Sequence, residues 1–546
     1  MSTSPGGPRP RAWRGRVGIV ASVALLVVLP LVPGVLATGS ALALVRIPVE
    51  SIVILLVLAV TPWRIPRVAL ATAFGLFVCL AMVLAGIDLG YEAALGTHFV
   101  PLDWPQLGDA YGVVAAAIGG VPAAALVAAA AAVIAAATAA LAWAALRVDA
   151  VLRRHAERGR AAIAAVTAVW VAIAAMASPL GLADPPAAAA SGGAIGSAVS
   201  RTVAALETRA TVARAIAGDP FADVDEDGLL TALRGKNVVF AFIESYGRVA
   251  LEDDEISDGV GGVLRRGEEV LTAEGYSAES AWLTSPTYGG ASWLAHATLQ
   301  TGVWIDSQTV YSEVVRSDRL TLSAAFAAAG WRTVSEVPSN TQDWPVGWEF
   351  YRFGTLLDAT NVGYRGPSFG YARIPDQYTW KHFADHQLVD QQRPVMAEID
   401  LVSSHTPWAP LPELLPWSEI GDGSVYDGQP ERSRPAGAVW EDRQTVQRFY
   451  GLSIEYALGA MFSFLENVDD PDLVVVALGD HQPAAIVSGE DADRDVPITI
   501  IAKDPGVLAA VAGWGWEPGL RPGAGSPIWR MDEFRDRFFT AFGTPP

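Results

Sequence analysis

The chain has 546 residues, of which 51% are hydrophobic, and its mean hydropathy of +0.30 is high for a soluble protein. Its single cysteine, Cys79, lies in an apolar run, which excludes an intrachain disulfide, a cysteine-cluster metal site and a cysteine nucleophile outside the membrane. Residues 1–183 hold 12 arginines against 7 acidic residues, whereas the rest is strongly acidic and an unfavourable partner for nucleic acid.

Five apolar stretches in the first 183 residues are long enough to span a bilayer. They cover about 17–37, 41–60, 68–86, 121–146 and 161–183. The leader and the loops at 63–67 and 147–160 are basic, whereas the loop at 87–111 has acidic residues and no Lys or Arg. Because basic loops remain in the cytoplasm, this alternation predicts a multi-pass protein of the cell membrane with a cytoplasmic N-terminus. Everything after residue 183 is then expected outside.

Three domains follow from this reading: five membrane spans at 1–183, a linker with juxtamembrane helices at 184–235, and an extracytoplasmic domain at 236–546. In the last of these, strands and helices alternate, which is typical of an α/β fold with a mostly parallel, doubly wound sheet. Strands are predicted at 238–243, 278–284, 331–337, 394–402, 473–478 and 496–502, and helices near 263–274, 292–302, 321–329, 376–389, 445–468 and 531–542. The helix at 376–389 is polar all round, so its His382 and His386 are expected at the surface.

Residues of metal-binding type follow three of the predicted strands. Glu244 ends the first, His405 follows the strand at 394–402, and Asp480-His481 follow the strand at 473–478 after Gly479, which is expected to supply a turn. In open α/β sheets the ligand crevice lies at the carboxyl ends of the strands. A solvated carboxylate or a chance histidine would explain each residue separately. Three such strand ends together favour a metal site.

Two hydroxyl residues compete as nucleophile in the loop before the predicted helix at 292–302. Ser292 opens the helix behind two glycines, where free N–H groups and the helix dipole favour an anion. Its alternative role is that of a simple N-cap. Thr287 follows Pro286 and gains no helix terminus, so it is the second choice.

Glu244, Ser292, Asp480 and His481 would supply oxygen ligands and one imidazole, which suits Mn²⁺ first and Zn²⁺ or Mg²⁺ as alternatives. A bound dication would lower the pKa of the Ser292 hydroxyl and prepare it to attack phosphorus or sulfur.

Four short motifs occur in the order seen in lipoteichoic acid synthases and phosphoglycerol transferases. They are Glu244-Ser-Tyr, Gly290-Ala-Ser292, Ser404-His-Thr-Pro407 and Gly479-Asp-His481. The chain therefore resembles these membrane-anchored members of the alkaline phosphatase/sulfatase superfamily over roughly 236–502, and its five-span half is similar to theirs. The resemblance implies metal ligands at Glu244, Asp480 and His481, a serine where those enzymes have a threonine nucleophile, and His405 near the transferred phosphate.

The chain also departs from these relatives. Where the synthases have an arginine two residues after the tryptophan that matches Trp344, this chain has Val346, which puts the substrate head group in question. It lacks the Cys/Ser-x-Pro-x-Arg motif of true sulfatases, and it cannot form the disulfides of lipid A phosphoethanolamine transferases.

The expected activity is metal-dependent transfer of a phospho-head group from a membrane phospholipid to a cell-envelope glycan or to water. A covalent Ser292 intermediate would form, and His405, Trp344 and Arg352 would contact the substrate. Simple hydrolysis of a phosphate or sulfate ester is one alternative. A catalytically silent envelope-binding protein is the other, although an intact, ordered ligand set argues against it.

Overall fold

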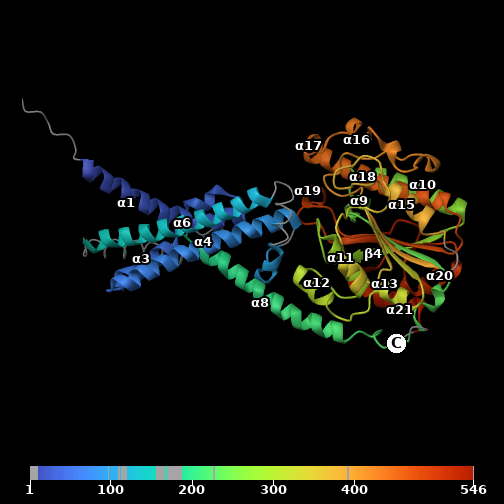
Figure 1. Cartoon of the computed structure of the whole chain (residues 1–546), viewed down its shortest axis with the longest axis horizontal. Coiled ribbons are helices and arrows are strands. Elements are labelled where there is room, and N and C mark those ends of the chain that lie inside the picture. Colours follow the sequence, from blue (N-terminus) through green and yellow to red (C-terminus); the bar gives the residue numbers. More distant parts are fainter. Residues whose placement is uncertain are drawn as a thin grey trace, which may run out of the picture. The chain divides into compact units, whose positions relative to one another are not determined.

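The computed structural model describes residues 10–95, 98–107, 111, 120–154, 165, 168, 187–225, 228–389 and 393–544. The chain forms two compact units, Met1–Glu207 and Thr208–Pro546 (Figure 1). Their boundary falls within helix α8 (Ala190–Ala217), inside the stretch predicted as a linker.

Among the described residues of the first unit, three helical stretches are long and apolar enough to cross a bilayer. They are Val17–Thr38, Arg64–Glu92 and Gly120–Arg154, and they correspond to the first, third and fourth predicted spans. Helices α4 (Arg64–Leu95) and α6 (Gly120–Arg154) pack closely at Gly75, where an added Cβ would lie 2.6 Å from the carbonyl oxygen of Thr138. Small residues at such contacts allow membrane helices to approach one another.

The second predicted span is not one continuous α-helix. Residues Ala41–Val45 form a 3₁₀ turn, Ile47–Pro48 form strand β1 with Ala187–Ala188 (β2), and α3 covers only Val49–Val60. Pro48 lacks a backbone N–H and lies directly before α3, which is where proline is compatible with a helix start. The fifth predicted span, 161–183, lies almost entirely outside the described residues.

The second unit is built on a nine-stranded sheet with the order β10–β4–β9–β8–β3–β7–β5–β6, and β11 pairs with β4. The strands are β3 (Asn237–Ile243), β4 (Ser277–Thr284), β5 (Arg332–Val337), β6 (Thr355–Asp358), β7 (Val395–Leu401), β8 (Leu473–Gly479), β9 (Asp495–Ala502), β10 (Glu517–Pro518) and β11 (Ile528–Arg530). The central strands β8, β3, β7, β5 and β6 are parallel. Strand β9 is antiparallel to both β8 and β4, so the sheet is mixed rather than uniformly parallel. Between β8 and β9 there is only the single-turn helix α19 (Ala485–Ser488), not the crossover helix typical of a parallel return.

Helices cover both faces of this sheet (Figure 1). On β3, Val238, Phe240 and Phe242 face one apolar cluster, whereas the alternate residues face the other, as expected for a strand that is buried on both sides. The first face is covered by α11 (Ser292–Thr301), α12 (Gln308–Val314), α13 (Leu322–Ala328), α20 (Pro505–Val511) and α21 (Phe534–Phe542). The second face is covered by α10 (Ser257–Glu274), α15 (Asp376–His386) and α18 (Arg443–Asn467).

The surface position predicted for His382 is wrong. His382 is buried, and its Nδ1 lies 2.9 Å from Oε1 of Glu336, a carboxylate inside strand β5. A polar helix face can pack against the sheet here because the buried charge has a hydrogen-bonding partner. His386 stacks on His382, with 4.5 Å between the ring centroids.

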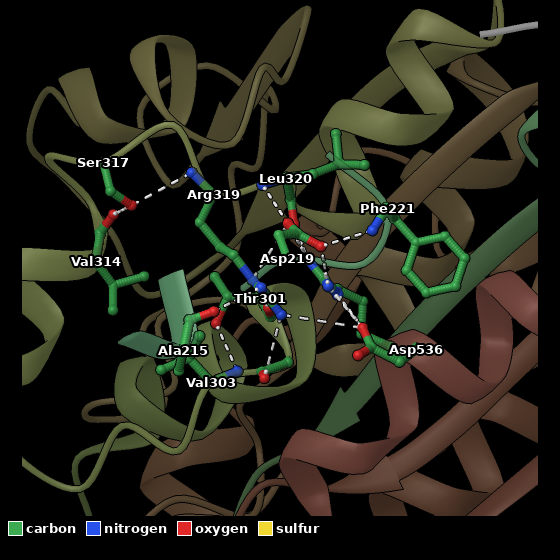
Figure 2. Close-up of polar contacts among 12 residues, drawn as sticks. Ala215, Asp219, Phe221, Thr301, Val303, Val314, Ser317, Arg319, Leu320 and Asp536 are labelled. Carbon is green, nitrogen blue, oxygen red and sulfur yellow. Dashed lines mark hydrogen bonds and ion pairs between the residues drawn. The ribbon is translucent and has the colours of Figure 1, made fainter. Parts of the chain in front are cut away.

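A buried charge cluster holds the end of α8 within the second unit (Figure 2). The Nη2 and Nη1 atoms of Arg535 lie 2.7 and 3.1 Å from the two carboxylate oxygens of Asp219. Burial raises the pKa of Asp219, but the hydrogen bonds and charge of Arg535 outweigh burial and lower it. Arg319 donates to the carbonyl oxygens of Ala215 in α8 (3.0 Å) and of Thr301 at the end of α11 (2.7 Å). One guanidinium therefore binds the negative ends of two helices.

Removing the Arg535 guanidinium is expected to destabilise the second unit. We expect Arg535→Met to lower the free energy of unfolding by about 3–5 kcal/mol, because Asp219 would remain buried without its bidentate partner. The matched control is Arg537→Met on the same helix, where the side chain is 44% exposed and a change of about 1 kcal/mol or less is expected. Denaturant unfolding of the detergent-solubilised full chain, followed by tryptophan fluorescence, compares them. Equal stability of the two variants would contradict the role of the cluster.

Candidate metal centre

The carboxyl ends of β3 and β8 bring three ligand-type side chains together. Glu244 follows β3, and Asp480 and His481 follow β8, which is its parallel neighbour in the sheet. Their ligand atoms all lie within 4.8 Å of one another, and all three residues are buried. These are the residues that the sequence placed at strand ends, and the structure brings them into one cluster.

The hydrogen bond of His481 fixes which of its nitrogens is free. Nδ1 lies 2.8 Å from the carbonyl oxygen of Gln482, an arrangement that assigns the ring proton to Nδ1. Nε2 then keeps its lone pair, and it lies 3.5 Å from both Oε1 of Glu244 and Oδ2 of Asp480. A backbone partner on one nitrogen is the usual way in which a protein orients a metal-binding imidazole.

Asp480 presents one satisfied and one unsatisfied oxygen. Its Oδ1 accepts two hydrogen bonds of 2.7 Å, from the backbone N–H groups of Ser245 and His481. Its Oδ2 is buried and has no hydrogen-bond partner among the described residues. Because buried polar atoms are nearly always paired, this oxygen fits a cation as its missing partner.

Electrostatics favour a cation at the same point. Burial raises the pKa of Glu244, but the charge of His405 and hydrogen bonds from Ser245 and Ser292 are among the influences that outweigh it and lower the pKa to about 2. Burial and the charge of Glu244 raise the pKa of Asp480. Two carboxylates therefore compete for negative charge in one buried site, and a bound cation would relieve their repulsion. Two carboxylates, one imidazole and a hydroxyl form a suitable donor set for Mn²⁺, Zn²⁺ or Mg²⁺.

Ser292 contacts this cluster directly. It is the first residue of α11, and its Oγ donates to Oε2 of Glu244 at 3.0 Å and lies 3.2 Å from Nε2 of His481. The residue in the N-cap position is Ala291, with a φ of +62°, so the alternative role of Ser292 as an N-cap is wrong. Its hydroxyl faces the cluster, and the first turn of its helix begins there.

The hydroxyl of Thr287, the second-choice nucleophile, lies outside the cluster. Oγ1 of Thr287 is 3.4 Å from Oγ of Ser285, which donates to the backbone oxygen of Asp480. Within the described part of the chain, Thr287 has no hydrogen bond to the side chains of Glu244, Asp480 or His481.

His405 lies within electrostatic reach of the cluster, because its charge is the leading influence that lowers the pKa of Glu244. Its ring stacks on Tyr371 with 3.6 Å between centroids. The neighbouring Ser404 donates a hydrogen bond of 2.6 Å to the carbonyl oxygen of Glu244, which ties the two strand ends together.

The structure does not bring Trp344 and Arg352 into contact with the ligand atoms among the residues it describes. Trp344 precedes α14 (Pro345–Glu349), and its ring lies 5.4 Å from that of Tyr351. Arg352 is exposed and has a φ of +59°.

A second polar group behind the cluster was missed by the sequence analysis. His296 stacks on Phe242, and its Nδ1 lies 3.5 Å from Oε1 of Glu398 and 3.6 Å from Oδ1 of Asp400. Burial lowers the pKa of His296, but Asp400 and Glu398 outweigh burial and raise it to about 9. Two signals in the sequence could have located this group. His296 lies four residues after Ser292, which places both on one face of a helix, and Glu398 and Asp400 are two residues apart in an otherwise apolar strand, which places both on one face of the sheet.

Comparison with known proteins finds similar solved structures. No family model and no curated relative matches the chain. Among solved structures, the lipoteichoic acid synthase LtaP of Listeria monocytogenes is 16% identical over 58% of this chain and 74% of that one, with a TM-score of 0.36. The phosphoglycerol transferase GacH of Streptococcus pyogenes, in complex with sn-glycerol-1-phosphate, is 15% identical over 61% and 81%, with a TM-score of 0.37. The soluble domain of lipooligosaccharide phosphoethanolamine transferase A of Neisseria meningitidis is 11% identical over 56% and 87%, with a TM-score of 0.35.

The first two are proteins of the kinds that the ordered motifs resemble.

Replacing either carboxylate of the cluster by an amide is expected to abolish tight metal binding. Asp480→Asn and Glu244→Gln should each weaken metal affinity by more than about 100-fold, because each removes a charged ligand rather than a residue that only supports one. Asp469→Asn is the control, since that side chain is 97% exposed. Metal content of the purified full chain after dialysis, measured by plasma mass spectrometry, checks this. Full metal content in both ligand variants would exclude the site.

Proposed function

We propose that the protein transfers a phospho-head group from a membrane phospholipid to a cell-envelope glycan, or to water, through a covalent Ser292 intermediate. The observation that carries this proposal is the position of the Ser292 hydroxyl. Its Oγ lies 3.0 Å from Oε2 of Glu244 and 3.2 Å from Nε2 of His481. Ser292 is also the first residue of helix α11. A nucleophile in reach of ionised and basic groups at a helix N-terminus is suited to attack on an anionic phosphorus centre.

Glu244, Ser292, Asp480 and His481 would hold the metal ion, with Mn²⁺ as the first choice and Zn²⁺ or Mg²⁺ as alternatives. A bound dication would supply Lewis acidity, which lowers the pKa of the serine hydroxyl and offsets charge on the phosphoryl oxygens.

The side chains of the site then have separate roles in the transfer. The Ser292 hydroxyl donates a hydrogen bond to Oε2 of Glu244, and its proton passes to solvent as the Oγ–phosphorus bond forms. The bond between phosphorus and the diacylglycerol oxygen breaks, and that oxygen takes up a proton from solvent. An acceptor hydroxyl next attacks phosphorus and releases its proton to solvent, the Ser292–phosphorus bond breaks, and the serine oxygen takes up a proton from solvent. The backbone N–H groups in the first turn of α11 and the side chain of His405 would bind the phosphoryl group.

Trp344 and Arg352 are assigned to the remainder of the substrate. With Val346 in the place of an arginine, this chain offers one positive charge fewer there than the synthases that it resembles. The assignment is supported by the motif match at Trp344 and by the exposed guanidinium of Arg352.

Two hydroxyl variants test the nucleophile. Ser292→Ala is expected to abolish turnover and to remove a head-group adduct detected by intact mass spectrometry of the full chain incubated with phospholipid. Thr287→Ala is expected to cost roughly tenfold, the equivalent of one hydrogen bond. Near-normal turnover by Ser292→Ala together with an inactive Thr287→Ala would move the nucleophile to Thr287.

We propose further that five spans place the N-terminus in the cytoplasm and the second unit outside the cell. The arrangement of basic loops supports this topology. Because Cys79 is the only cysteine, a Cys79→Ser chain is a clean background for labelling. In intact cells, a membrane-impermeant maleimide should label Asp469→Cys in the second unit but not Ser4→Cys in the leader. The reverse pattern would invert the topology.

A further inference from the structure

A hollow of about 370 Å³ opens at the carboxyl ends of β5 and β6. It is lined by Ser335 and Val337 of β5, by the loop and helix α14 that follow, and by Asp358 at the end of β6. Its volume lies within the range of about 300–1,000 Å³ that is common for small-molecule sites.

The hollow shares a sheet edge with the candidate metal centre but is separate from it. Strands β3, β7, β5 and β6 are parallel and adjacent in that order, so their carboxyl ends face the same side. At about 4.8 Å per strand, β5 lies roughly 10 Å from β3. A ligand in the hollow would therefore lie on the same side of the sheet as the candidate metal centre.

The charge of the lining excludes an anion. Asp343, Glu349 and Asp358 line the hollow, whereas none of its lining residues is Lys, Arg or His. A phosphate or sulfate group would meet three carboxylates with no compensating cation. The lining therefore selects a neutral or a cationic ligand.

Two indoles give the hollow a flat apolar wall. Trp344 and Trp348 both line it, and Trp348 is 49% exposed. An exposed indole offers a rigid apolar face at low entropic cost, and such faces mark binding surfaces. The C–H face of a sugar ring matches an indole, while its hydroxyls match the surrounding carboxylates and amides.

The hydroxyl of Ser335 distinguishes a polyol from an ammonium ion. Ser335 is 1% exposed, and its Oγ has no hydrogen-bond partner in the part of the chain that the structure describes. A buried hydroxyl of this kind requires a partner, and it can both donate and accept. A ligand hydroxyl satisfies both capacities, whereas an ammonium group can only donate.

We propose that this hollow binds a neutral sugar ring and is the acceptor subsite of the transfer reaction. Only its role as an acceptor site rests on the proposed function, since sugar binding by itself requires no turnover.

Equilibrium binding to the detergent-solubilised full chain tests the proposal by saturation-transfer NMR. The probes are methyl glucoside, methyl galactoside and N-acetylglucosamine as neutral sugars, choline as the ammonium ion, and glycerol 3-phosphate as the anion. At least one neutral sugar should bind with a Kd of about 1–10 mM, equally well in the wild type and in Ser292→Ala. Trp348→Ala should weaken binding at least about tenfold and Asp343→Asn a few-fold. Trp304→Ala, which removes an indole stacked under Arg530, is the matched control and should leave it unchanged.

Three results would overturn the proposal: no neutral sugar binds, choline binds in a Trp348-dependent manner in place of sugars, or glycerol 3-phosphate does so. The outcome is independent of catalysis. Sugar binding without a Ser292 adduct would exclude the proposed transfer but keep the subsite, whereas an adduct without sugar binding would exclude the subsite alone.

Discussion

The constraint on which the second unit depends is the burial of two carboxylates side by side. Glu244 and Asp480 are 9% and 1% exposed, at the ends of neighbouring strands. Burial of like charges is unfavourable unless other groups offset it. Here two backbone N–H groups bind one oxygen of Asp480, a hydroxyl binds each oxygen of Glu244, and histidines lie around both. Oδ2 of Asp480 has no such partner among the described residues, and a cation would supply one.

The fold supplies this arrangement through parallel pairing and one close backbone approach. Because β8, β3 and β7 are parallel neighbours, the residues that follow them meet at one edge. Gly479 was expected to provide a turn, yet it is the last residue of β8, and it is needed because a Cβ there would overlap the carbonyl oxygen of Tyr246. The space between two strands, rather than a special dihedral angle, therefore requires glycine before Asp480.

Local sequence patterns predicted the elements that correspond to an uninterrupted run of apolar residues. The apolar runs of β3 and β8 and the residues directly after them located Glu244, Asp480 and His481, because the end of a buried strand is visible in one stretch of sequence. Strand direction is not encoded in such a run, so the antiparallel β9 could not be anticipated. Strands of two to four residues, such as β6 and β10, are too short to show a period.

The buried partners of polar residues could not be predicted from the sequence for a related reason. His296 in helix α11 becomes compatible with the interior only because Glu398 and Asp400 face it from strand β7, a pairing that joins residues about a hundred positions apart. The same applies to His382 and Glu336. A single sequence shows each of these residues as polar, and only the folded chain shows that each has its counter-charge.

The contacts of Arg319 have a mechanical consequence. Its guanidinium clamps the end of α8, the helix that enters from the first unit, to the end of α11 at Thr301. Helix α11 has ten residues and is therefore about 15 Å long, with Ser292 at its opposite tip. If α11 tilted by about 5° about its Thr301 end, the serine oxygen would move by about 1 Å, a misplacement that can cost about 100-fold in rate.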